Sequence, residues 1–220
     1  AGRDSFEDQI YFEENEMIRS NVTVKLEAKA DLASIKALNP DAVVIATGST
    51  PRVPHDVEGL NQPHVVQGWD VISGKAKLGQ RIAIISQEDY YETPCVAEFI
   101  AAQGKDVTVF HKSVHLGSEI ARYSIGMVHK RMEEFNVQVK NNLVLTKVDG
   151  NAIELASAWG GKTYREEGFD TIVLVYASTA QCELYDQLKA EGAVKELYLA
   201  GAAWLPRHMA ESTRHGANIG

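Results

Sequence analysis

One short segment in the first quarter of the chain constrains the fold more than any other. It reads Asp-Ala-Val-Val-Ile-Ala-Thr-Gly-Ser-Thr-Pro over residues 41–51. The β-branched run Val43–Ile45 is typical of a strand that is covered on both faces of a sheet. Gly48 then permits a positive φ, and Pro51 stops the strand from continuing. The segment therefore predicts a buried strand of an α/β protein that ends at a tight turn.

Length and composition describe an ordinary globular protein. The chain has 220 residues, of which 45% are hydrophobic and 24% charged, and its net charge is −8. This acidic balance argues against a nucleic-acid or anionic-membrane partner, because both need clustered cations. No apolar run approaches the ~18 residues of a membrane span, and the amino end shows no signal peptide. Cys95 and Cys182 form no Cys-x-x-Cys pair, which predicts buried, reduced thiols and a cytoplasmic location.

The order of the predicted elements indicates a parallel sheet. A strand at 81–86, a helix that ends at Gly104 and a strand at 106–110 form a βαβ unit. An antiparallel β meander follows, with turn-type residues between its strands at 142–148, 152–159 and 163–165. Near the amino end, residues 22–26 alternate as Val-Thr-Val-Lys-Leu and predict one more strand. The fold class is therefore α/β, with a parallel sheet and an antiparallel meander.

Several segments together carry a resemblance to a known family. They are Ala1–Asp4, Ala46–Gly48, the loop 86–94 followed by Ala97-Glu98, the turn Ala158–Gly160 and the strand Tyr198–Gly201. In this order they resemble the C-terminal half of the old-yellow-enzyme-related NADH:flavin oxidoreductases, which include the 2,4-dienoyl-CoA reductases and the trimethylamine and histamine dehydrogenases. The resemblance covers essentially the whole chain. Trp159-Gly160 and Tyr90-Tyr91-x-x-Pro94 look closest to the amine dehydrogenases.

The resemblance implies Rossmann-type, FAD/NAD(P)-binding-like domains of three layers. By this resemblance, residues 1–72 and 190–220 form part of an FAD/ADP-type domain. Residues 77–176 form an NAD(P)-type domain, and 177–189 a connecting helix. In the family a preceding TIM barrel carries FMN and a cysteine-ligated 4Fe-4S cluster, and ADP or FAD binds to the first dinucleotide-type domain. We therefore expect a C-terminal fragment of a longer polypeptide, whose barrel is its partner and which itself binds no cofactor tightly.

The loop where NAD(P) would bind lacks the glycines that such a site needs. Between strand and helix, G-x-G-x-x-G lets a pyrophosphate approach the helix N-terminus. Here residues 86–94 read Ser-Gln-Glu-Asp-Tyr-Tyr-Glu-Thr-Pro and place three carboxylates in that position. The candidate NAD(P)-type residues are Ser86 and Gln87 on this loop and His111 and Lys112 at the next strand end, where basic side chains can receive a 2′-phosphate. We expect this site to be non-functional.

The candidate FAD/ADP-type residues lie at two glycines. They are Thr47 and Gly48 at the crossover, and Gly201 and Ala202 after the final strand. The family pattern at the final strand is Gly-Asp-Ala, so Ala202 stands where a carboxylate would contact flavin or ribose. This replacement argues against tight flavin binding. We predict no metal site among the seven histidines and no catalytic residue. In particular, Ser-His-Asp catalysis has no G-x-S-x-G elbow to support it.

Three functions remain open at this point. The first is the nucleotide-domain part of a flavin-dependent oxidoreductase of the amine dehydrogenase type, with a structural role or a role in docking an electron-transfer protein. The second is a working NAD(P)H-binding module that delivers hydride to a flavin, and the third is a non-catalytic interaction domain. A second copy of the chain is a further candidate partner. An upstream barrel with a cysteine cluster would exclude the third function.

Overall fold

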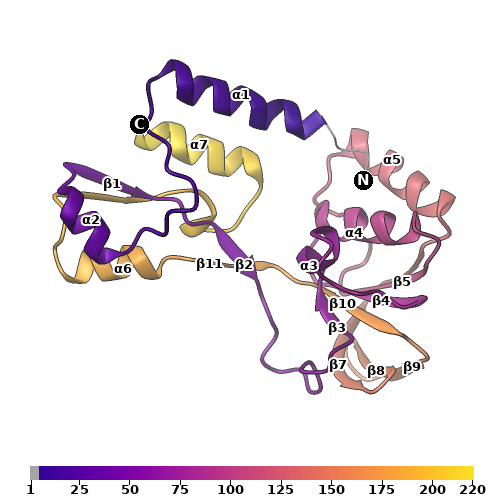
Figure 1. Cartoon of the computed structure of the whole chain (residues 1–220). Helices are drawn as coiled ribbons and strands as arrows, with labels where there is room; N and C mark the ends of the chain where they lie inside the picture. Colours follow the sequence, from indigo (N-terminus) through magenta and orange to yellow (C-terminus); the bar gives the residue numbers. More distant parts are fainter. Residues whose placement is uncertain (1–4) are drawn as a thin grey trace. The chain divides into compact units, whose positions relative to one another are not determined.

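The computed structural model describes residues 5–220, and Ala1–Asp4 of the resemblance lie outside the described residues. The chain forms two compact units (Figure 1). Unit 1 consists of the residues up to Thr50 together with Thr179–Gly220, and unit 2 of Pro51–Ser178. The strands β2 (Ser49–Pro51) and β11 (Ser178–Ala180) pair with each other where the chain leaves unit 1 and where it returns.

Unit 2 is built around a five-stranded parallel sheet with the strand order β3-β10-β4-β5-β6. A separate antiparallel sheet, β7-β8-β9, is the predicted meander. The elements are β3 (Val65–Gln67), α3 (Gly68–Ile72), β4 (Arg81–Ser86), α4 (Glu92–Ala101), β5 (Asp106–His111), α5 (Arg122–Glu134), β6 (Gln138–Lys140), β7 (Leu143–Asp149), β8 (Ala152–Ser157), β9 (Thr163–Glu167) and β10 (Thr171–Val175).

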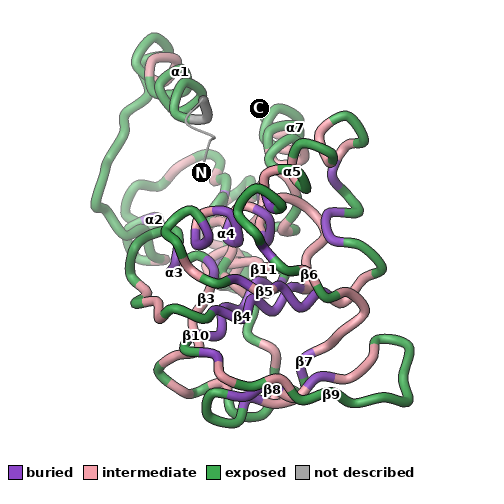
Figure 2. Tube along the Cα trace, turned by 90° about the vertical axis from the view of Figure 1, so that its right-hand side faces the viewer, coloured by how far each residue is buried: buried purple, intermediate pink, exposed green. Residues whose placement is uncertain are grey.

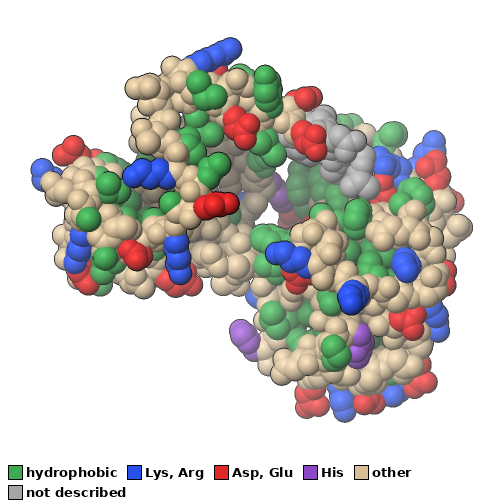
Figure 3. All heavy atoms as spheres, in the orientation of Figure 1, with side chains coloured by type: hydrophobic (Ala, Val, Ile, Leu, Met, Phe, Trp, Pro, Cys, Tyr) green, Lys and Arg blue, Asp and Glu red, His purple; other side chains and the backbone are tan. Residues whose placement is uncertain are grey.

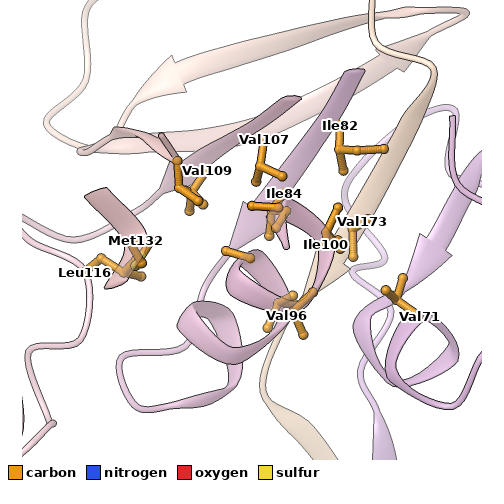
Figure 4. Close-up of a cluster of buried hydrophobic side chains, with 14 residues drawn as sticks. Val71, Ile82, Ile84, Val96, Ile100, Val107, Val109, Leu116, Met132 and Val173 are labelled. Carbon is orange, nitrogen blue, oxygen red and sulfur yellow. The ribbon is translucent and has the colours of Figure 1, made fainter. Parts of the chain in front are cut away.

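The parallel sheet is the middle of three layers. Side chains alternate along β4, so that Ile82 and Ile84 join a core cluster with residues of α3, α4 and α5 (Figure 4). Ala83 and Ile85 point to the other face and pack against the meander. Burial is concentrated along these central strands and on α4 (Figure 2). The α/β, three-layer fold class is thereby confirmed.

Unit 1 holds a parallel pair of strands, β1 (Ala42–Ile45) and β12 (Glu196–Leu199), with Val44 opposite Tyr198. A small core of Ile35, Ile45 and Leu188 lies between this pair and two helices. The remaining elements are α1 (Ser5–Arg19), α2 (Leu32–Leu38), α6 (Glu183–Ala190), the 3-10 helix η1 (Gly201–Ala203) and α7 (Met209–Ile219). Asp31 caps α2 through the Ser34 N–H in a reciprocal capping box.

The unit boundaries differ from the domain boundaries that the resemblance implies. Residues 51–72 lie in unit 2, because β3 pairs in parallel with β10. The helix α6, expected as a connection, lies in unit 1, because Leu188 is fully buried in its small core.

The predicted strand at residues 22–26 is wrong. No strand forms there in the described structure, and Val22, Val24 and Leu26 are exposed. An alternating pattern becomes a strand only where a neighbouring strand supplies hydrogen bonds, and none of the described strands pairs with this segment.

Candidate functional site

The four FAD/ADP-type candidates follow the two paired strands of unit 1. Thr47 and Gly48 come after β1, and Gly201 and Ala202 after β12, so all four lie beyond the carboxyl ends of a parallel pair. The Gly48 carbonyl accepts a hydrogen bond from the Gln181 N–H at 3.0 Å, and the Thr47 hydroxyl donates to the Gln181 carbonyl. These bonds hold the outgoing and returning segments of the chain together.

The second half of this region faces helix α7. Gly201 has a φ of +58°, which favours glycine, and its N–H donates to Nδ1 of His215 at 3.3 Å. The His215 ring also packs against the Trp204 ring, with 4.6 Å between the ring centroids. Ala202 offers only a methyl group, so its side chain cannot supply the carboxylate of the family pattern.

In the loop after β4, the Glu88 carboxylate accepts hydrogen bonds at the start of helix α4. One oxygen of Glu88 accepts the Tyr90 N–H at 2.7 Å, and the other accepts the Thr93 N–H. A helix N-terminus favours anions, because its first N–H groups lack partners and carry partial positive charge. The Glu88 carboxylate therefore occupies the place that a bound phosphate takes in a dinucleotide site.

Asp89 is the centre of a second set of contacts. Its carboxylate accepts hydrogen bonds from the Ser118 hydroxyl at 2.9 Å and the Ser113 hydroxyl at 3.1 Å, and it lies 3.1 Å from Nε2 of His111. The Asp89 carbonyl also accepts the Glu119 N–H at 2.9 Å. Burial raises the pKa of Asp89, but the hydrogen bonds from Ser118 and Ser113 and the nearby His111 lower it below its ordinary value overall.

Ser86, His111 and Asp89 lie in the order of a Ser-His-Asp triad. Ser86 Oγ lies 2.9 Å from Nδ1 of His111 and 2.8 Å from Oγ1 of Thr93. Ser86 and His111 are fully buried, however, so no substrate can reach the hydroxyl. Burial lowers the pKa of His111, although Asp89 opposes this shift. The arrangement is a buried hydrogen-bond network between β4, β5 and α4.

Glu92, the first residue of α4, is the third carboxylate of this loop. Burial and the neighbouring Glu88 raise the pKa of Glu92 to about 7, and a hydrogen bond with the Trp69 side chain opposes the shift. Glu92 therefore takes up its proton near neutral pH, far above the ordinary glutamate range.

The four NAD(P)-type candidates lie together at the carboxyl ends of two neighbouring strands, β4 and β5. Ser86 and His111 are opposite each other in the register of β4 and β5, and Gln87 and Lys112 follow them. His111 is fully buried, so its ring is not available to a 2′-phosphate. Sequence reasoning missed the roles of Thr93, Ser113 and Ser118 in this network. The acid-rich loop was the only feature of the sequence that pointed to this network, because no motif relates the loop to Ser113 and Ser118.

No group of three or more His, Cys, Asp or Glu among the described residues could hold a metal ion. His111 and His115 are four residues apart, but both ring nitrogens of His111 lie at Ser86 and Asp89. Both cysteines are free and half-buried, so the prediction that both are buried is wrong. No described helix combines the length and apolar character that crossing a membrane requires.

The surface charge is mixed. In the face drawn in Figure 3, Lys and Arg side chains are interspersed with Asp and Glu side chains over both units. On the meander, Arg165 forms exposed ion pairs with Asp149, Glu154 and Glu167.

Comparisons with known proteins place these features in context. The profile of a family described as OYE-like second alpha/beta domain matches residues 66–172. Dimethylamine dehydrogenase of Hyphomicrobium sp. (strain x) is 30% identical over 210 residues, which cover 80% of this chain and 28% of that protein. The structure of a 2-naphthoyl-CoA reductase in complex with 2-naphthoyl-CoA has a TM-score of 0.87 and 27% identity, and the match covers 97% of this chain and 32% of that one.

Histamine dehydrogenase from Rhizobium sp. 4-9 has the same fold, with a TM-score of 0.79 and 21% identity over 88% of this chain and 32% of that one. The chain thus spans between a quarter and a third of the length of these three proteins.

Proposed function

We propose that this chain, whose residues 66–172 match the family described as OYE-like second alpha/beta domain, is the nucleotide-domain part of a flavin-dependent oxidoreductase of the amine dehydrogenase type. In this proposal it is a C-terminal part of a longer cytoplasmic polypeptide, whose barrel holds FMN and an iron–sulfur cluster for the redox chemistry. The units described above shape that protein or dock an electron-transfer partner, and they bind no pyridine nucleotide.

The observation that carries the expected lack of pyridine-nucleotide binding is the Glu88 carboxylate at the N-terminus of α4. Glu88 already uses the Thr93 N–H, and Pro94 has no N–H to offer. Among the first three residues of α4, only Glu92 keeps an N–H that an anion could use, and its own side chain is acidic. A pyrophosphate would have to displace one carboxylate and approach a second, and like charges at contact distance cost several kcal/mol at intermediate dielectric.

The test is a titration of the 220-residue chain with NADH and with NADPH. Binding is measured by calorimetry and by the fluorescence of the nicotinamide. We expect no binding with a Kd below ~1 mM, which corresponds to a binding free energy of about −4 kcal/mol. Lys112→Ala is the matched variant, because Lys112 is a half-buried base directly after the end of β5. A micromolar Kd that Lys112→Ala abolishes would overturn the proposal in favour of a hydride-delivering module.

The gene offers an independent test against the third function, an interaction domain without chemistry. The coding sequence upstream of this chain should encode a barrel with a cluster of cysteines. An upstream region without such a barrel would leave the interaction domain as the better description.

A further inference from the structure

A cavity of about 350 Å³ lies in unit 2, at the carboxyl end of β10. Its lining comes from four places in the chain: Arg52–Val57, Gln87, Val144-Leu145 and Tyr176. Its volume falls within the range of small-molecule sites, about 300–1,000 Å³. In parallel α/β sheets, ligands bind beyond the carboxyl ends of the strands, which is where Tyr176 and Gln87 lie.

This cavity is separate from the loop that Glu88 and Asp89 fill. Tyr176 and Leu145 belong to the core cluster between the sheet and the meander. Val96 and Ala97 of helix α4 pack in the cluster on the opposite face of the sheet. A ligand in the cavity therefore does not need the phosphate position at the start of α4.

The cavity contains a buried hydroxyl that no described residue satisfies. Tyr176 is only 3% exposed, and its hydroxyl has no hydrogen-bond partner among the described residues. Burial, with a contribution from Asp56, raises the pKa of Tyr176 to about 12, so the phenol keeps its proton at neutral pH and can donate. Buried hydroxyls usually have a partner, which points to an acceptor other than the described residues, such as a ligand.

The rest of the lining divides into an apolar part and a charged part. Val57, Val144 and Leu145 provide the apolar surface. Arg52 lies close enough to Tyr176 to lower the pKa of its phenol, and the Arg52 guanidinium has no ion pair among the described residues. An unpaired guanidinium beside a donating phenol suits a carboxylate, which accepts two hydrogen bonds from the guanidinium in a planar fork.

We propose that this cavity binds a small monocarboxylate with an apolar body, whose carboxylate accepts hydrogen bonds from Arg52 and Tyr176. The apolar body packs against Val57, Val144 and Leu145. Asp56 also lines the cavity, so a second carboxylate on the ligand meets a like charge. The site therefore selects one negative charge, and it rejects neutral amides, amines and dicarboxylates.

The test uses benzoate as the probe and the isotope-labelled 220-residue chain in an NMR titration. We expect saturable shifts at residues 52–57, 87, 144–145 and 176. Arg52→Gln should weaken binding about tenfold or more and Tyr176→Phe about fivefold, because each removes a hydrogen bond to a charged group. Arg122→Gln is the matched control, since Arg122 is an exposed arginine on α5 of the same unit, and it should leave benzoate binding unchanged.

Three further probes test the chemistry of the ligand. Benzamide, benzylamine and phthalate should each bind at least about tenfold more weakly than benzoate. The inference is overturned if benzoate produces no saturable shift up to about 20 mM, if benzamide binds as well as benzoate, or if Arg52→Gln and Tyr176→Phe bind like the unaltered chain. A melting curve for each variant establishes that it is folded, and none of these outcomes depends on the NADH titration.

Discussion

Nε2 of the buried His111 lies 3.1 Å from Oδ1 of Asp89, and Nδ1 of the same ring lies 2.9 Å from Oγ of Ser86. If the ring is neutral and donates from Nε2–H to Asp89, Nδ1 accepts the Ser86 hydroxyl proton. Ser86 then accepts from the Thr93 hydroxyl, 2.8 Å away. In that arrangement each polar group of this network has a partner, and the buried imidazole stays neutral. The triad-like order of Ser86, His111 and Asp89 therefore stabilises the fold.

Removing the carboxylate of Asp89 should destabilise unit 2. Asp89→Ala leaves His111, Ser113 and Ser118 without their acceptor, and we expect the free energy of unfolding to fall by about 2–4 kcal/mol. Urea denaturation measures this loss. Asp106→Ala, at the exposed start of β5, is the matched control and should change stability by less than about 0.5 kcal/mol.

The Asp89 carboxylate should also make the stability of the chain depend on pH, with stability lost in acid. The pKa of Asp89 is lowered in the folded chain from its ordinary value of 3.8. Its contribution to stability is therefore fully present above that value and is lost as the pH falls through the folded pKa. The difference in stability between the unaltered chain and Asp89→Asn should shrink in acid. A difference that stays constant down to about pH 2 would show that the charge of Asp89 is not involved.

Glu88 should behave as a cap of helix α4. Glu88→Ala removes the acceptor of the Tyr90 and Thr93 N–H groups, and the expected cost is about 0.5–2 kcal/mol of stability, the usual range for a lost N-terminal cap. Glu88→Gln should cost less, because the amide oxygen still accepts one of these bonds. Thermal unfolding of both variants measures the order. Equal stability of Glu88→Ala and the unaltered chain would contradict the capping contact.

The layers of unit 2 were predictable because their signals are local. β4 and β5 read as buried strands, and glycine-containing turns separate the strands of the meander. The strand expected at 22–26 failed for the opposite reason, since only a neighbouring strand could have stabilised it. The boundary between the two units at Thr50 could not be predicted from the sequence either, because it depends on the pairing of β3 with β10, which lie about a hundred residues apart.

The candidate site was predictable only in part. The sequence shows that the loop 86–94 has no glycine and three carboxylates, which predicts repulsion of a pyrophosphate. It does not show that Glu88 folds back onto α4, because that contact depends on the backbone path of the loop. Nor does it show that Asp89 meets His111, since this contact requires the parallel register that places Ser86 opposite His111.

Glu92 should make the fold less stable as the pH rises from about 4.5 to about 7. Its ordinary pKa is 4.5, and burial and Glu88 raise it to about 7 in the folded chain. Between these values the folded state holds the extra proton, so this stabilisation is complete below about pH 4.5 and is lost as the pH rises through 7.

Glu92→Gln mimics the protonated side chain at every pH. We expect it to raise the free energy of unfolding by about 1–3 kcal/mol near pH 8 and to change little near pH 4. Denaturant titrations at the two pH values measure this. Glu133→Gln, at an exposed residue of α5, is the control. It should change the free energy of unfolding by the same small amount at both pH values. A parallel pH profile for Glu92→Gln and the unaltered chain would refute the raised pKa.

The Tyr176 hydroxyl should be unfavourable for the ligand-free chain. It is buried without a partner among the described residues, so Tyr176→Phe removes an unsatisfied group while the ring keeps its packing. We expect the free energy of unfolding to rise by about 0.5–1.5 kcal/mol, since the folded state no longer has to desolvate that hydroxyl. Tyr164→Phe, on the exposed β9 strand, is the matched control and should be neutral. Thermal and urea unfolding measure both variants. A loss of more than about 1 kcal/mol in Tyr176→Phe would show that the hydroxyl has a partner inside the protein, and no acceptor from a ligand would then be needed.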